Sequence, residues 1–311
     1  MKKWEGQLFL FFAFSLAGTG VIFARLASGR LGPFTIGATG LFFALIVLIP
    51  LSGKRLKEGI RTLSGKGLFF LVTQALFGIF LFRLFLLLGL AHTSSMEAGI
   101  ITGATPAITA VLAALVLKER VGAARLWGIG CTVAGILFLQ GEWGAEGLSL
   151  THIGGNLLVL MSAACESVFN ILSRVYAIQA GQKGGKTLPP LVQTTLVSLF
   201  AFILCAIPAL FEKPIQGLGQ ASPTEWTALV CYGVFVTALA FIFWYAGIKR
   251  SSAFTAAAYS GMMPLTSMLL SVGILREKAG WQEALGGLLV ISGMLIIGMK
   301  GKEARVITAE S

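Results

Sequence analysis

The stretch that decides the fold is residues 89–139, GLAHTSSMEAGIITGATPAITAVLAALVLKERVGAARLWGIGCTVAGILFL, which realigns without a gap onto residues 247–297, GIKRSSAFTAAAYSGMMPLTSMLLSVGILREKAGWQEALGGLLVISGMLII, at an offset of 158. The two copies share Gly89/Gly247, Ser94/Ser252, Ala98/Ala256, Gly103/Gly261, Pro106/Pro264, Leu117/Leu275, Glu119/Glu277, Gly128/Gly286 and Gly135/Gly293. Chance similarity between apolar helices rarely keeps proline, glutamate and glycine together. The second half of the chain therefore repeats the first.

Composition places the chain in a membrane. Of its 311 residues, 56% are hydrophobic and 12% are charged, and its mean hydropathy is +0.86. Soluble domains carry roughly a quarter charged residues. Glycine is also abundant, with 39 residues, as expected where small residues let membrane helices approach closely. The four cysteines lie in apolar runs without CxxC spacing, so neither a zinc site nor a disulfide framework is expected.

Hydropathy predicts an all-α integral membrane protein with ten transmembrane helices. Each apolar run has about 17 to 23 residues, enough to cross roughly 30 Å of hydrocarbon. The predicted spans are residues 8–24, 34–51, 68–90, 96–117, 123–139, 157–176, 191–211, 226–247, 253–275 and 281–299. Nine spans follow the first, so we expect an uncleaved first helix rather than a signal peptide.

The cations predict the orientation. With the N-terminus inside, 18 of the 24 Lys and Arg residues face the cytoplasm, five face outward, and Arg83 alone lies within a span. Cytoplasmic loops of membrane proteins collect such residues. We therefore expect a multi-pass protein of the plasma membrane with both termini in the cytoplasm. The same asymmetry explains the net charge of +11 through the anionic inner leaflet of the lipid bilayer, so no nucleic acid partner is expected.

Five spans per copy is an odd number, so the second copy must cross the membrane in the opposite sense and the repeat is inverted. The expected organisation is a first five-helix repeat at 1–140, an outer connecting loop at 141–153, a second five-helix repeat at 154–300 and a cytoplasmic tail at 301–311. The turns at Glu119 and Glu277 join the fourth and fifth helices of each half, and we expect them to cap and orient tight helical hairpins.

These residues also carry a family resemblance. Each half runs from a polar helix start (Ser94, Ser252) through a mid-helix proline and a Leu-x-Glu turn to a glycine-spaced fifth helix. In this respect nearly the whole chain resembles the ten-helix EamA-type members of the drug/metabolite transporter superfamily. The resemblance implies a central cavity lined by the first four helices of each half, with the fifth and tenth helices peripheral. It does not specify a substrate, because this family moves amino acids, amines, carboxylates and other metabolites.

The two prolines predict where a substrate binds. Pro106 and Pro264 lie at the centres of the fourth and ninth spans, where proline frees a backbone carbonyl and kinks the helix. Interrupted helices at equivalent positions of two halves point to the binding site. The predicted cavity-lining residues of these spans are Thr102, Thr105, Pro106, Tyr259, Met263 and Pro264. The alternatives are a packing kink without ligand contact and hydroxyls that bond their own helix.

Ionisable residues inside spans are functional candidates, because charge in a membrane is costly. Arg83 and Glu97 each lie roughly 10 Å below the same outer turn, counted at 1.5 Å per residue, and are predicted to form an intramembrane ion pair. Glu166, at the centre of the sixth span, has no cation within one turn. Such a carboxylate can carry a proton or attract a cationic substrate group, and Asn170 at i+4 can bond it. The alternatives are static roles in packing and register.

Gly18 and Thr19 mark the narrowest part of the first span, and Arg25 lies near its outer end. We expect all three to contact the cavity, with Arg25 favouring anions at its mouth unless it only extends toward the interface.

No catalytic chemistry emerges. All 13 acidic residues are glutamate, which removes a Ser-His-Asp triad, and neither His92 nor His152 has metal-ligand spacing. We expect no cofactor, no bound metal and no enzymatic activity.

The predicted function is that of a secondary transporter of a small organic metabolite such as an amino acid or amine. Export is a family-level expectation, and proton coupling is one option. The alternatives are a membrane-embedded lipid-handling enzyme or flippase, and an ion channel. The oligomeric state is left open.

Overall fold

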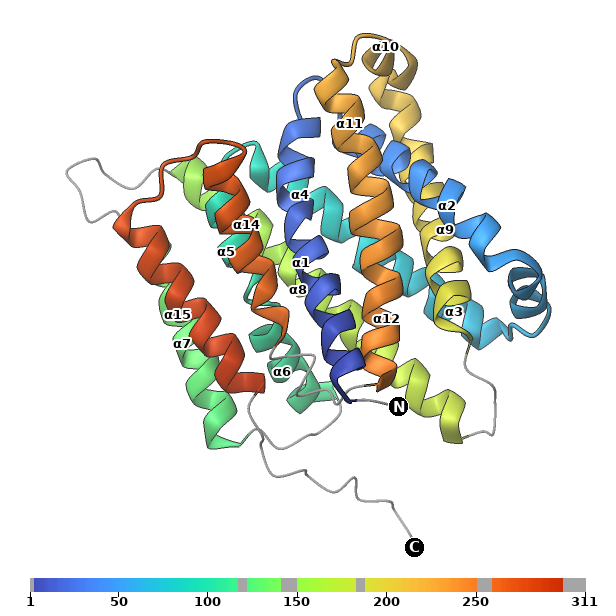
Figure 1. Ribbon diagram of the computed structural model, residues 1–311, viewed down its shortest axis with the longest axis horizontal. Coiled ribbons are helices and arrows are strands. Elements are labelled where there is room, and N and C mark those ends of the chain that lie inside the picture. The colour runs from blue at the N-terminus through green and yellow to red at the C-terminus, as the bar shows by residue number, and fades with distance from the viewer. Residues whose placement is uncertain (1–2, 117–121, 141–149, 183–187, 251–258, 299–311) are drawn as a thin grey trace, which may run out of the picture.

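The fold is all-α, as predicted. The computed structural model describes residues 3–116, 122–140, 150–182, 188–250 and 259–298, and the regular structure within these ranges is entirely helical (Figure 1). Seven helices in this part of the chain are long and apolar enough to cross a membrane, and three further apolar helices are shorter. An all-α membrane protein is thus confirmed, while the count of ten crossings stays a prediction.

The elements follow the predicted spans closely. The first half holds α1 (Lys3–Ala27), α2 (Pro33–Arg61), α3 (Gly65–Ala75), η1 (Leu76–Leu81), α4 (Phe82–Leu90), α5 (Ser95–Thr102), α6 (Thr105–Val116) and α7 (Ala123–Gln140). The second half holds α8 (Leu150–Gln182), α9 (Pro190–Ala209), η2 (Leu210–Glu212), α10 (Pro214–Gly219), α11 (Pro223–Cys231), η3 (Tyr232–Leu239), α12 (Ala240–Arg250), α14 (Met262–Gly273) and α15 (Trp281–Gly298).

One predicted boundary is wrong. Hydropathy ends the second span at Leu51 and predicts a loop after it, but α2 runs on to Arg61 after a sharp change of direction at Gly53. Gly53 adopts φ +49° and ψ −135°, a conformation that a residue with a side chain rarely adopts. Apolar composition ends at Leu51, whereas the helix continues, because the basic segment after Gly53 still has helical propensity once it leaves the hydrocarbon.

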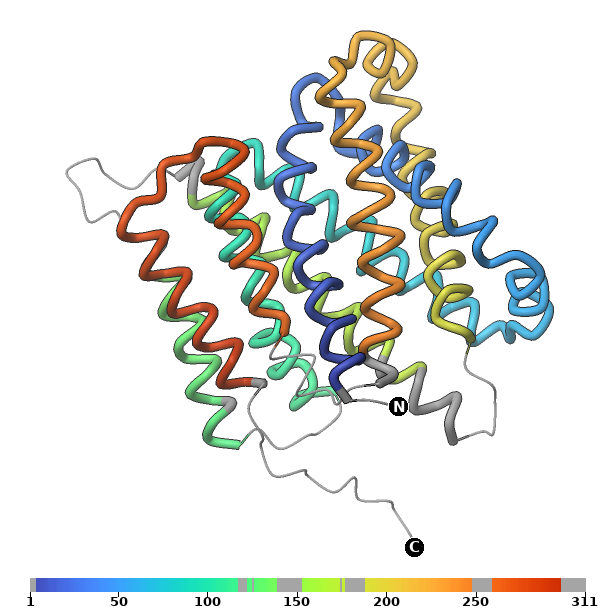
Figure 2. Tube along the Cα trace, viewed as in Figure 1, coloured from blue at the N-terminus to red at the C-terminus, as the bar shows by residue number. Residues whose placement is uncertain are grey.

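The fifth helices of the two halves pair with each other in an antiparallel manner. A Cβ added at Gly128 stands 2.7 Å from the carbonyl oxygen of Gly293, and one added at Gly135 stands 2.8 Å from that of Gly286. Because Gly128 corresponds to Gly286 and Gly135 to Gly293, the contact is reciprocal, as at a two-fold interface. This is the pairing that an inverted repeat requires. Figure 2 shows the two helices, α7 and α15, side by side at one edge of the bundle.

The second spans of the two halves, α2 and α9, also contact each other. Near one end, Glu212 after α9 accepts hydrogen bonds from the backbone N–H of Thr35 at 2.7 Å and from that of Phe34 at 3.2 Å, at the start of α2. Near the other end, the hydroxyls of Ser52 and Thr195 lie 2.6 Å apart. The carboxylate at the α2 N-terminus supplies charge where the helix dipole favours it. The two halves are therefore joined by polar bonds as well as by apolar packing.

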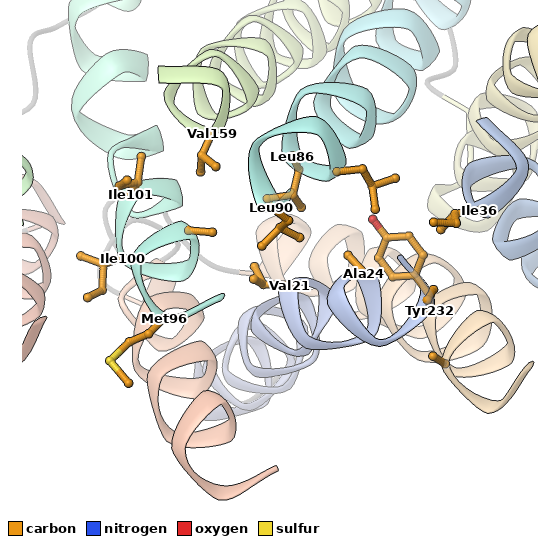
Figure 3. Packing of buried hydrophobic residues seen from close by; sticks show 14 of the residues in the cluster. Val21, Ala24, Ile36, Leu86, Leu90, Met96, Ile100, Ile101, Val159 and Tyr232 are labelled. Carbon is orange, nitrogen blue, oxygen red and sulfur yellow. The ribbon is translucent and has the colours of Figure 1, made fainter. Parts of the chain in front are cut away.

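The third helices of both halves change to π-helix in mid-span. η1 interrupts the third span and η3 interrupts the eighth. The two segments occupy nearly equivalent positions of the two sequence repeats. Hydrogen bonds of the i→i+5 type widen a helix locally and are frequent at functional sites. The largest buried apolar cluster lies beside η3: in Figure 3 the ring of Tyr232 packs near Ala24 of α1 and Ile36 of α2.

Candidate functional site

The fourth span is broken where proline predicts it. α5 ends at Thr102 and α6 begins at Thr105, with the backbone N–H of Gly103 bonded to Ile100 in a tightened last turn. Pro106 has no N–H to donate to the carbonyl of Thr102. The Thr105 hydroxyl takes over that role and donates to the Thr102 oxygen at 2.9 Å. The Thr105 side chain therefore replaces the one ladder bond that Pro106 cannot make.

Glu166 of α8 reaches this break. Its Oε2 accepts a hydrogen bond from the Thr105 hydroxyl at 2.8 Å, and the neighbouring Ser167 hydroxyl donates to the Thr105 carbonyl at 3.0 Å. The structure thus brings together four residues that the sequence predicts separately, Thr102, Thr105, Pro106 and Glu166. The predicted bond from Asn170 is not formed within the described chain, since the bond to Glu166 comes from another helix.

The ninth span has a matching break. Gly261 is the N-cap of α14, and Pro264 lies in the first turn of that helix. Gly18 of α1 packs directly on this turn: a Cβ added there stands 2.5 Å from the carbonyl oxygen of Met263. The structure therefore brings together Gly18 and Met263, two residues that the sequence predicts separately to line the cavity. Thr19 instead bonds its own helix, donating to the Leu16 carbonyl at 2.6 Å, and Tyr259 lies half-buried just before the break.

The two broken helices touch each other. The Ser267 hydroxyl of α14 lies 3.5 Å from the carbonyl oxygen of Ser95 in α5, and Gly99 packs against the Ser267 side chain. At the start of α5, Glu277 accepts hydrogen bonds from the backbone N–H groups of Ser95 at 3.0 Å and Met96 at 2.9 Å. Glu277 thus caps a helix of the other half, in addition to any role in its own hairpin. Glu119 lies outside the described residues.

The structure gives Arg83 and Glu97 different hydrogen-bond partners, in place of the predicted ion pair. Arg83 Nη2 donates to the Thr237 hydroxyl, and the guanidinium stacks over the Tyr232 ring with its Cζ 4.2 Å from the ring centroid. Glu97 instead accepts a hydrogen bond of 2.6 Å from the Thr93 hydroxyl, which also contacts Asn156 of α8. Equal depth in two helices does not determine which way each side chain faces, and here α4 turns Arg83 toward η3.

Arg25 also has a role that the sequence did not predict. Its Nη1 donates to the carbonyl of Leu90, the last residue of α4. A cation at a helix C-terminus satisfies an unpaired carbonyl and complements the helix dipole. The structure therefore assigns Arg25 to capping α4, and the expectation that it faces the cavity mouth is not supported by its hydrogen bond.

Sequence reasoning missed Tyr232 and Thr237, the two partners of Arg83. Both are fully buried in η3, and the Thr237 hydroxyl also contacts the Tyr232 carbonyl at 3.1 Å, five residues earlier. The available signal was a threonine and a tyrosine near the middle of an apolar span. Hydroxyl groups in a span are common, however, and the pairing of Thr237 with Arg83 depends on a contact between helices 154 residues apart in the chain.

An aromatic group lies next to Glu166 along α8. Phe169, one turn later, contacts the Trp244 ring at 5.8 Å and the Phe241 ring at 6.1 Å between centroids. Trp244 packs in turn on Tyr245 at 4.7 Å. Aromatic faces attract cations, so this group and Glu166, three residues before Phe169 in α8, both suit a positively charged ligand. Within the described residues no group of three His, Cys, Asp or Glu side chains is placed to hold a metal ion.

Comparison with known proteins gives consistent results. A sequence model described as the EamA-like transporter family matches residues 4–140 and, a second time, residues 153–299. The uncharacterized transporter YetK of Bacillus subtilis is 27% identical over 304 residues, covering 97% of this chain and 89% of that protein. An uncharacterized transporter of Archaeoglobus fulgidus is 24% identical over 280 residues, covering 88% of this chain and 91% of its own. A solved crystal structure shares the fold, with a TM-score of 0.66, 23% identity, and coverage of 94% of this chain and 95% of that chain.

Proposed function

The chain belongs to the EamA-like transporter family and is a multi-pass membrane transporter, and from this premise we propose that it is a secondary transporter of a small organic metabolite, such as an amino acid, an amine or a related compound. It works by alternating access around a site between the two halves, where helices broken at equivalent prolines meet. Outward transport is proposed from the family resemblance described above.

The observation that carries this proposal is the position of Glu166 at the break between α5 and α6. A carboxylate among apolar spans is costly and is by default a functional candidate. Here it bonds Thr105, whose hydroxyl also reaches the Thr102 carbonyl that Pro106 leaves without its helical donor. Phe169, three residues later in α8, packs against the Trp244 ring, and aromatic faces favour a cation. Glu166 is therefore proposed to carry a proton or to balance a cationic group of the substrate.

The hydrogen bonds of Thr105 suggest how protonation is transmitted. This residue has one hydroxyl hydrogen and two acceptors, the Thr102 carbonyl at 2.9 Å and Glu166 at 2.8 Å. An ionised Glu166 competes for that hydrogen. A protonated Glu166 donates its own hydrogen to the Thr105 oxygen, so that the threonine can bond the Thr102 carbonyl. Binding or loss of a proton at Glu166 thus changes the bond that spans the break.

The test is a counterflow screen in proteoliposomes over amino acids, amines, carboxylates and nucleosides, with and without an imposed pH gradient. Saturable exchange of one labelled solute against its unlabelled form is expected. Consumption of a substrate without any gradient indicates a membrane enzyme instead, and flux that does not saturate indicates a channel. Either result, in the absence of counterflow, rejects the transport proposal.

Orientation is a separate prediction. We propose a plasma-membrane location with both termini cytoplasmic, which places the exposed Lys57 of α2 inside and the exposed Gln216 of α10 outside. In a background without the four native cysteines, a membrane-impermeant thiol reagent on intact cells is expected to label Gln216→Cys and to leave Lys57→Cys unlabelled until the cells are permeabilised. The reverse labelling pattern contradicts the orientation.

A further inference from the structure

We propose that Arg83 binds a single carboxylate group on the transported solute, an inference that rests on the transport function proposed above. The guanidinium is deeply buried, since Arg83 is only 5% exposed, and its Nη1 has no hydrogen-bond partner within the described chain. A buried charged donor without an acceptor is strongly unfavourable. An anionic group that arrives with the substrate satisfies it.

The surroundings hold the guanidinium by one edge and one face. Nη2 is bonded to Thr237, and the plane of the group lies over the Tyr232 ring at 4.2 Å. Both partners belong to the π-helical segment η3, which is itself held by the Thr237 hydroxyl on the Tyr232 carbonyl. Nη1 is therefore fixed in direction and buried, with no acceptor in the described chain. Such pre-orientation reduces the entropic cost of ordering the arginine side chain when a ligand binds.

Gly40 of α2 keeps side-chain atoms away from Nη1. A Cβ added at this position stands 3.7 Å from Arg83 Nη1 and 3.3 Å from Cδ1 of Tyr232. Any residue larger than glycine therefore places atoms between α2 and the free nitrogen. Gly40→Ala therefore adds a methyl group beside Nη1 while it leaves the charge in place.

The fold does not require a charge at this position. At the repeat offset of 158, the counterpart of Arg83 is Phe241, and the counterpart of Tyr232 is Gln74. Phe241 fills the equivalent place with aromatic contacts, including Phe169 at 6.1 Å. The scaffold therefore accepts an apolar side chain in one copy, and the arginine of the other copy needs a different explanation.

The charge balance favours a carboxylate over a phosphate. Arginine and carboxylate form short, directional, charge-assisted hydrogen bonds, and one buried guanidinium compensates one negative charge. Two carboxylates of other helices that could have served as internal partners are bonded elsewhere: Glu166 accepts from Thr105, and Glu212 accepts from the start of α2. A phosphate dianion leaves a second charge uncompensated among apolar helices.

The experiment compares acids with their amides. Purified protein in proteoliposomes is assayed by counterflow with L-amino acids and short monocarboxylates, each beside its primary carboxamide, and with glycerol 3-phosphate as the phosphate case. We expect the acid to exceed the amide at least about tenfold in initial rate, because a site built for an ionic hydrogen bond rejects the analogue that lacks it. Arg83→Gln is expected to lose this preference and Arg83→Lys to keep part of it. The exposed Arg61→Gln serves as the matched control.

Folding is checked separately by size-exclusion chromatography and thermal denaturation in detergent. If Arg83→Gln does not fold, Gly40→Ala is decisive, and it is expected to raise the half-saturation concentration for the acid. Equal rates for acid and amide in the unmodified protein, or an unchanged preference in a folded Arg83→Gln, overturn the carboxylate inference while the transport function stands. Preference for glycerol 3-phosphate overturns the choice of carboxylate. Absence of counterflow for every solute rejects the proposed function itself.

Discussion

Glu166→Gln is expected to abolish the part of transport that depends on a pH gradient while folded protein is produced at the normal level. Glutamine has the size of glutamate and keeps most of its hydrogen-bonding capacity, but its side-chain amide does not titrate and so cannot bind or release a proton during transport. Its amide donates to the Thr105 oxygen as a protonated Glu166 does, so the substitution holds the break between α5 and α6 in one state. The measurement is the initial uptake rate with and without an imposed pH gradient.

The controls separate titration from packing. Glu58→Gln, at an exposed position of α2, is expected to behave like the unmodified protein. Thr105→Val removes the bond to Glu166 and keeps the carboxylate, so a weaker but still pH-dependent rate is expected. If Glu166 only balances a cationic substrate, Glu166→Gln lowers affinity and leaves the effect of pH on turnover. Native rate together with native pH dependence in Glu166→Gln would reduce this residue to a packing role.

Gly128→Ala is expected to destabilise the protein, because the added methyl group has no room between α7 and α15. The new methyl group meets Cγ1 of Ile297 at 2.6 Å and two backbone atoms of α15, the Gly293 carbonyl oxygen at 2.7 Å and the Ile297 nitrogen at 3.0 Å. Backbone cannot rotate away as a side chain can. Forcing extra volume into packed helices costs about 1 to 3 kcal/mol. The measurement is the midpoint of thermal denaturation of the purified protein in detergent.

Gly130 provides the matched control two residues away in the same helix. A Cβ added there meets nothing within 4 Å, so Gly130→Ala is expected to be neutral or slightly stabilising, because alanine favours helix over glycine. Both variants change glycine to alanine in α7, and they differ in whether the position faces α15. Equal midpoints for Gly128→Ala and Gly130→Ala would show that the close contact between α7 and α15 contributes nothing to stability.

Several features of the site can be predicted from the sequence because they depend on local chemistry. Proline lacks an N–H wherever it stands in a helix, so Pro106 and Pro264 mark the two breaks by their positions in the chain alone. A carboxylate in a long apolar run is conspicuous for a similar reason, and Glu166 stands out whatever its neighbours are. Its bond to Thr105 places it at the predicted break.

Other features were missed because a sequence reports depth along a helix and not rotation about its axis. Arg83 and Glu97 match in depth, yet Arg83 faces Thr237 and Tyr232 of η3. The two π-helical segments have no sequence signature comparable to proline, although each one shifts the facing of every residue that follows it. The sequence suggests a cavity mouth for Arg25. It does not reveal the contact with the Leu90 carbonyl, because that contact joins two separate helices.

By itself, the sequence determined the membrane environment, the repeat, the positions of the apolar helices and the two broken spans, since composition, hydropathy and proline act within a single helix. Only the tertiary structure decided which polar groups meet: Glu166 with Thr105, Glu277 with the start of α5, and Arg83 with Thr237. Those contacts depend on how each helix is rotated against its neighbours. That rotation is set by the summed packing of many side chains from both halves, and no single residue encodes it.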